Sequence, residues 1–152
     1  MLKLDEVDFT CGRASFVDSL KNFQEPTAKI FVKICLEGRI DSGFYAQLDT
    51  GAAWSVLDPV IAKSLGLIGT GNLRTQLNIQ LNTRFGILKG NLIPLNVTFL
   101  ARDGQHLDTS APFFISPDWP EGRTFLGYSG LLDSIRFALD PQRNHFYFGP
   151  GI

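Results

Sequence analysis

The residues best suited to chemistry are the triplet Asp49-Thr50-Gly51, which follows one apolar stretch and leads into another. Asp49 supplies a carboxyl group that can act as an acid or a base. A glycine at position 51 would let the backbone take a conformation closed to other residues and bring amide N–H groups close to that carboxylate. The Thr50 hydroxyl could bond to a neighbouring loop. The triplet alone also fits an ordinary Asx turn in a β-hairpin, so its sequence context has to decide.

A second segment, Thr124-Phe125-Leu126-Gly127, places apolar residues and a glycine before a potential short helix. Together with residues 48–57, it resembles the two active-site elements of the retropepsin-like aspartic peptidases. The resemblance covers roughly residues 29–149, and the chain is most similar to the single-domain members found in bacterial genomes. Residues 1–28 lie outside the resemblance and are expected to form an N-terminal extension, with the peptidase domain at 29–152.

The resemblance implies hydrolysis of peptide bonds by a water held between two carboxyl groups. Two carboxylates about 3 Å apart cannot both ionise, so the pair keeps one acid and one base. The chain carries one good Asp-Thr-Gly triplet, so the second Asp49 would come from another copy in a homodimer. The expected ligand is a peptide or protein substrate, with no cofactor and no metal. The expected catalytic residues are Asp49, Thr50 and Gly51, and the expected substrate-binding residues are Ala52, Thr83, Arg84, Phe85, Gly86, Phe125 and Leu126.

The family closes its cleft with a β-hairpin flap, and residues 82–86 are the expected tip of that flap. Gly86 would give the tip freedom, and Phe85 could cover apolar substrate side chains. A plain surface turn is the alternative. The family's richer glycine tip is missing here, so we expect a stiffer or differently shaped flap. An acidic residue and an arginine that pair in many viral members are replaced here by Ala53 and Tyr128. Trp54 could take over part of that role by packing with Tyr128.

Several other residues could imitate a functional site. Asp108, in Leu107-Asp108-Thr109-Ser110-Ala111, stands only 59 positions after Asp49, too close to belong to a second lobe. We expect it near the start of a strand. His106 and His145 lack the spacing of metal ligands. Trp119, between two prolines, fits a substrate pocket, a dimer surface or a structural anchor.

Short apolar segments separated by turn residues predict a mainly β protein, a closed antiparallel barrel of the acid-protease type. A hairpin is expected from residues 30–36 and 44–48, an alternating strand at 73–81, and a terminal hairpin from 135–139 and 145–148. Further strands are expected at 87–88, 92–100 and 111–115, with Pro94 marking an edge or a bulge. One short helix, capped by Asp58, is expected near 58–65 and another near 129–135. Residues 1–28 are expected to be irregular.

Composition narrows the class of protein. The 152 residues suit one domain; the formal net charge of −1 argues against a nucleic-acid binder that depends on bulk positive charge. No apolar run is long enough to span a membrane, and the N-terminus does not resemble a secretory signal. Two cysteines, Cys11 and Cys35, are expected to be reduced thiols in a cytoplasmic protein.

Two alternatives to the peptidase hypothesis remain open. The chain could have the same fold and bind peptides or a partner protein without cutting them. It could also be a precursor whose residues 1–28 must be removed. Retention of the Asp-Thr-Gly triplet favours the peptidase, since a pure binder has no need of a buried carboxylate.

Overall fold

The computed structural model describes residues 1–21, 25–68 and 78–152. Six strands pair in a ring in the order β10–β6–β11–β5–β4–β8, and β8 pairs back with β10 to close a barrel. The predicted closed, mainly β barrel is therefore confirmed. Two pairings, β10–β6 and β11–β5, are parallel, and the others are antiparallel. The strands of the ring are β4 (Phe31–Leu36), β5 (Phe44–Leu48), β6 (Ser55–Val56), β8 (Gly86–Phe99), β10 (Leu107–Ile115) and β11 (Phe125–Leu126).

A second sheet packs against the barrel. Its strand order is β12–β13–β3–β9, from β12 (Ile135–Asp140), β13 (His145–Pro150), β3 (Gly12–Ser15) and β9 (Asp103–Gly104). Fully buried Phe146 and Phe148 of β13 contact Phe99 of β8, with ring centroids 5.8 and 5.7 Å from it. These contacts join the two sheets through one hydrophobic core.

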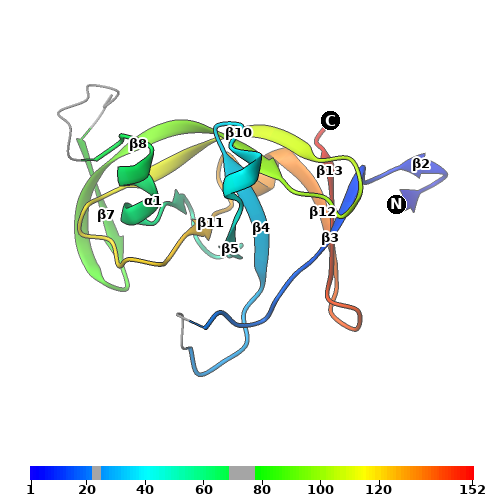
Figure 1. Ribbon diagram of the computed structural model, residues 1–152, viewed down its shortest axis with the longest axis horizontal. Helices are drawn as coiled ribbons and strands as arrows, with labels where there is room; N and C mark the ends of the chain where they lie inside the picture. Colours follow the sequence, from blue (N-terminus) through cyan, green and yellow to red (C-terminus); the bar gives the residue numbers. More distant parts are fainter. Residues whose placement is uncertain (22–24, 69–77) are drawn as a thin grey trace.

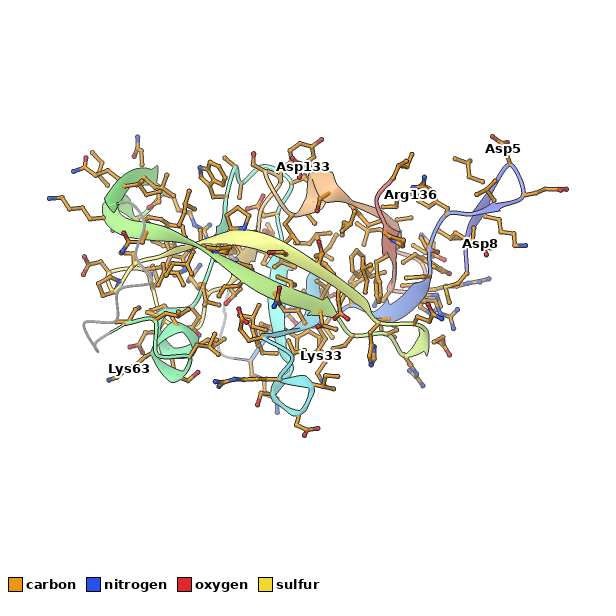
Figure 2. All side chains as sticks on the ribbon, turned by 90° about the horizontal axis from the view of Figure 1, so that it is seen from above. Asp5, Asp8, Lys33, Lys63, Asp133 and Arg136 are labelled. Atoms are coloured by element: carbon orange, nitrogen blue, oxygen red, sulfur yellow. The ribbon has the colours of Figure 1, made fainter. Side chains whose placement is uncertain are left out.

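The N-terminal residues differ from the expected irregular segment. Residues of β3 pair with β13 and β9, and the side chains of Ala14 and Phe16 are buried in the main core. This pairing joins segments far apart in the sequence, so no local hydrophobic pattern indicated it. Ahead of β3, β1 (Lys3–Leu4) and β2 (Val7–Asp8) form an exposed hairpin. That hairpin carries Asp5 and Asp8 at the end of the molecule opposite Lys63, as Figure 2 shows.

The helical segments are short. Helix α1 (Pro59–Ser64) is capped as predicted, because the Asp58 carboxylate accepts a hydrogen bond from the Val60 N–H at 2.9 Å. The helix expected near 129–135 is only a 3₁₀ turn, η2 (Leu132–Ser134). Gly130 has φ +80°, a conformation outside the right-handed helix, which prevents an earlier start. A further 3₁₀ turn is η1 (Ile40–Ser42). No helix among the described residues is long and apolar enough to cross a membrane.

Strand β7 (Asn78–Thr83) is not part of the ring. It pairs with the first residues of β8 and forms a hairpin with that strand. This hairpin lies at the end of the molecule away from both termini (Figure 1). The alternating pattern predicted at 73–81 is represented by β7 from residue 78 onward, and residues 73–77 lie outside the described part. Pro94 lies opposite Pro112 of β10. There β8 pairs on one side only, which agrees with the predicted edge character.

The thiols of both cysteines are free in this structure. Cys35 is fully buried in β4, and Cys11 is partly buried beside β9. Burial raises the pKa of the Cys11 thiol, which favours the protonated form.

Leu126 tests how strongly the barrel depends on its central short strand. Its side chain is completely buried, so Leu126→Ala should leave a cavity and lower the free energy of unfolding by about 2–5 kcal/mol. Val60→Ala on the exposed face of α1 is the control and should change that free energy by no more than about 0.5 kcal/mol. Urea unfolding measures both. Equal effects of the two substitutions would contradict this assignment of the core.

Candidate functional site

The loop that carries Asp49 is held in place by β11. The N–H of Gln47 donates to the Thr124 carbonyl at 2.8 Å, and the N–H of Asp49 donates to the Leu126 carbonyl at 3.0 Å. After the loop, β6 pairs with the other edge of β11. The second sequence element therefore lies between the strand that enters the Asp49 loop and the strand that leaves it.

Bonds from buried side chains lock these elements together. The Ser55 hydroxyl accepts from the Gly127 N–H at 2.9 Å, and the Thr124 hydroxyl accepts from the Asp58 N–H at 3.1 Å. At Gly127 a Cβ atom would overlap the backbone of Trp54 and Ser55. The glycine of the second element is thus required by close approach of two chain segments.

The backbone beyond Gly127 continues the same contact. The N–H groups of Tyr128 and Ser129 donate to the carbonyls of Ala52 and Ala53, each at 2.8 Å. The two positions at which the sequence lacks the viral type of ion pair, Ala53 and Tyr128, therefore each take part in a main-chain bond between the two segments. The side chain of Tyr128 is 52% exposed.

Asp49 is half-buried, and its Oδ1 accepts a hydrogen bond from the Gly51 N–H at 3.0 Å. The geometry is that of an Asx turn, one of the two possibilities left by the sequence. Gly51 does not have a left-handed backbone, so the expectation of an unusual conformation is wrong. A Cβ at this position would lie 3.3 Å from Asp49 Oδ1, so the glycine serves close approach to the carboxylate. Thr50 is exposed, and its hydroxyl makes no hydrogen bond within the described residues.

Asp49 opens into a cleft of about 870 Å³, large enough for several side chains of a peptide. Six of the expected site residues line this cleft: Asp49, Gly51, Ala52, Thr83, Arg84 and Phe125. Four others do not line it: Thr50, Phe85, Gly86 and Leu126. Leu126 points into the barrel core, whereas its neighbour in the strand, Phe125, faces the cleft.

The β7–β8 hairpin contributes one wall of the cleft through residues 81–84. Its tip is a tight turn in which the Thr83 hydroxyl accepts from the Phe85 N–H at 3.1 Å and donates to the Gly86 carbonyl at 2.9 Å. Gly86 has φ +102°, which favours glycine. The turn predicted within residues 82–86 is therefore present.

Aromatic rings fasten this tip to the opposite wall. The Phe85 ring meets Trp119 edge-on, with centroids 5.2 Å apart, and Trp119 meets Phe125 in the same way at 5.5 Å. The Trp119 indole N–H donates to the Arg123 carbonyl at 2.6 Å. Trp119 is both a buried structural anchor and a residue of the cleft wall, two of the roles that its sequence context allowed.

A cluster of charges lies beside these rings. Glu25 Oε1 accepts from Arg84 Nη2 at 3.2 Å and from Arg123 Nη1 at 2.9 Å. The hydrogen bond from Arg123 and the positive charge of both arginines hold the pKa of Glu25 below its ordinary value, against an opposing effect of desolvation. At neutral pH, Glu25 is thus an anion that ties residues before β4 to the hairpin tip.

The other acidic triplet found in the sequence belongs elsewhere. Asp108 is the second residue of β10, as predicted, and its Oδ1 accepts from the Thr98 hydroxyl at 2.5 Å. It lines a separate hollow with Asn96 and Thr109. Asp49 is the only carboxylate among the described residues that line the cleft, and residues 22–24 and 69–77 contain no Asp or Glu.

The remaining polar candidates do not form a metal centre. The described residues contain no group of three or more His, Cys, Asp or Glu side chains that could hold a metal ion. His106 Nδ1 instead accepts from the Ala101 N–H at 2.8 Å, a structural use of the ring.

Sequence reasoning missed several residues of the cleft wall, among them Lys29, Gln47, Trp54 and Leu81. Gln47 could have been found, because residues two apart in a strand point to the same face and Asp49 follows it by two. The Gln47 amide oxygen is buried and lacks a hydrogen-bond partner among the described residues. Lys29 offered no such signal, since it belongs to the segment before β4.

The chain was compared with known proteins by sequence and by structure. No family model matches the chain, and no curated protein matches it by sequence. Among solved structures, a retropepsin-like aspartic protease from Rickettsia conorii is similar, with a TM-score of 0.53 and 17% identity. The similarity covers 93% of this chain and 94% of that one. The two proteins therefore share a fold, the one suggested by the two sequence elements.

The Glu25 cluster should respond to acid. Because the pKa of Glu25 is lowered in the folded protein, its ionic contacts are intact at neutral pH and are lost as the pH falls through that lowered pKa. We expect weaker protection of the amides of residues 83–86 on acidification, measured as the exchange rate relative to the intrinsic rate of an unstructured chain at the same pH. Glu25→Gln should show fast exchange already at neutral pH, and Glu121→Gln, an exposed neighbour in sequence of Arg123, should behave like the unmodified chain. Slow exchange in Glu25→Gln would contradict this role.

Proposed function

We propose that the chain is an aspartic endopeptidase whose active site forms when two copies bring their Asp49 carboxyl groups together. The observation that carries the proposal is a lone carboxylate, on a tightly braced Asp-Thr-Gly turn, at the floor of a cleft of peptide size. The fold shared with a solved retropepsin-like aspartic protease supports it.

The chemistry requires a second acid. Two Asp49 carboxyl groups that face each other would share one proton, so one is a base and the other an acid at the same pH. The base takes a proton from a water held between them, and the water oxygen attacks the peptide carbonyl carbon. The acid gives its proton to the carbonyl oxygen. The carboxyl group that took the water proton then gives it to the amide nitrogen, the other carboxylate takes the proton of one hydroxyl of the resulting diol, and the C–N bond breaks to leave a carboxylic acid and an amine.

The surface around Asp49 suits a second copy. Thr50, Gly51 and Ala53 are exposed on the loop, and the Tyr128 side chain beside them is half-exposed. A symmetric partner would cover these residues and give the Thr50 hydroxyl a chance to bond across the interface. Thr50 and Gly51 would then position the carboxyl pair.

The remaining walls would bind the substrate. The β7–β8 hairpin acts as the flap, with Thr83 and Arg84 facing the peptide. Phe125 and Ala52 offer apolar surface on the floor. Phe85 and Gly86 form the flap tip, and the Phe85 ring would cover apolar side chains of the substrate. Leu126 supports the floor from inside the barrel.

The substitution Asp49→Asn tests the proposal, because an amide cannot act as the base. It should lower kcat for peptide cleavage by at least about 10²-fold, with unchanged unfolding and unchanged sedimentation. Asp108→Asn removes a carboxylate outside the cleft and is the matched control, expected to keep full activity.

The competing function is a fold relative that binds peptides without cutting them. It predicts no cleavage by the unmodified chain in either its single or its paired form, together with peptide binding that Asp49→Asn does not alter. Full activity of Asp49→Asn would instead exclude the aspartic mechanism altogether.

A further inference from the structure

Two arginines from separate elements converge on one carboxylate at the edge of the cleft. Arg84 belongs to the tip of the β7–β8 hairpin, and Arg123 lies two residues before the start of β11. Both donate to the same oxygen, Oε1 of Glu25, at 3.2 and 2.9 Å. This pair, which we call the arginine clamp, is a site for a carboxylate that already holds one.

The clamp is sheltered and oriented by its surroundings. The side chains of Arg123 and Glu25 are only 23% and 16% exposed, whereas that of Arg84 is 50% exposed. The Arg123 and Arg84 guanidinium groups lie 5.3 and 4.9 Å from the centroid of the Phe85 ring. Stacking on an aromatic ring limits the freedom of a guanidinium and reduces its contact with water, so a bound carboxylate is held more strongly than on an open surface.

The clamp adjoins the wall that a peptide would touch. Arg84 itself lines the cleft, and its guanidinium is 5.6 Å from the ring of Phe125, another wall residue. Lys29 adds a second cation to the same lining, against the single carboxylate of Asp49. The proposed function uses that carboxylate for catalysis, so the remainder of the described wall is positively charged.

We propose that the arginine clamp is a specificity subsite for an acidic side chain of the peptide substrate, and that Glu25 occupies this subsite in the free protein. The inference rests on the proposed function only in taking the ligand to be a peptide. Glu25 would be a competitor supplied by the chain itself, from residues that run directly to Lys29 on the cleft wall.

The competition follows from tethering. A carboxylate attached to the same chain acts at a high effective concentration, so an acidic substrate side chain must displace Glu25 before it can bind. Removal of the Glu25 charge should therefore strengthen the binding of acidic peptides relative to their uncharged counterparts, because loss of the brace on the hairpin tip changes both classes of peptide by the same factor. A Glu25 that served only to brace the hairpin would affect both classes of peptide alike.

The test measures binding by a full-length chain that carries Asp49→Asn, so that no peptide is cut. Short fluorescein-labelled peptides are compared in pairs that differ by Glu or Gln at one position, with Kd from fluorescence anisotropy. In this background Glu25→Gln should increase the preference for the Glu peptide at one position by about fivefold. A further substitution, either Arg84→Gln at the half-exposed hairpin tip or Arg123→Gln, should abolish this increase in the preference for the Glu peptide. Arg143→Gln, on the exposed turn between β12 and β13, is the control and should not change this preference.

An unchanged Glu-to-Gln preference in Glu25→Gln, or a preference that survives Arg84→Gln, would overturn the inference. Failure of every acidic peptide to bind would do the same. Cleavage by the unmodified chain separates this result from the proposed function. Cleavage without discrimination between Glu and Gln would contradict the specificity subsite and support the peptidase. Selective binding without cleavage would contradict the peptidase and support the subsite.

Discussion

The candidate site depends on the insertion of one two-residue strand, β11, between the strands on either side of the Asp49 loop. Backbone bonds from Gln47 and Asp49 to this strand fix where the carboxylate leaves the sheet. The absence of a side chain at Gly127 lets the strand's continuation lie against Trp54. Since β11 is also buried in the barrel core, the position of the catalytic candidate and the stability of the fold have the same origin.

Under the proposed function, this arrangement gives a single chain only half of the reaction centre. A single carboxylate on the cleft floor can accept a proton, but peptide hydrolysis of this kind also needs an acid at the same place and the same pH. The aromatic contacts of Phe85 and the ionic contacts of Glu25 meanwhile hold the hairpin tip against the chain's own cleft wall. The single copy is thus a closed form, and the proposed peptidase would require its tip to be released.

The sequence predicted those features whose causes are local. The cap at Asp58, the turn at residues 83–86 and the Asp-Thr-Gly turn each follow from short-range chemistry, and the two motifs together indicated the barrel. Features that depend on contacts between distant parts of the chain were not predicted from the sequence. Strand β3 forms because β13 offers a partner edge, and Lys29 and Arg123 reach the cleft region only through the closure of the barrel. Of the two roles assigned to Gly51, the approach of its N–H to the Asp49 carboxylate is present and the unusual backbone conformation is not. The sequence could not separate them, because close approach and an unusual φ both favour glycine.

The central claim is that each active site contains Asp49 from two chains, and mixed dimers test it most directly. Unmodified and Asp49→Asn chains are mixed in varied proportion at constant total concentration, allowed to exchange partners, and assayed for peptide cleavage. If a site needs both carboxylates, activity falls with the square of the fraction of unmodified chain. Activity proportional to that fraction would mean that one chain suffices, and would contradict the account.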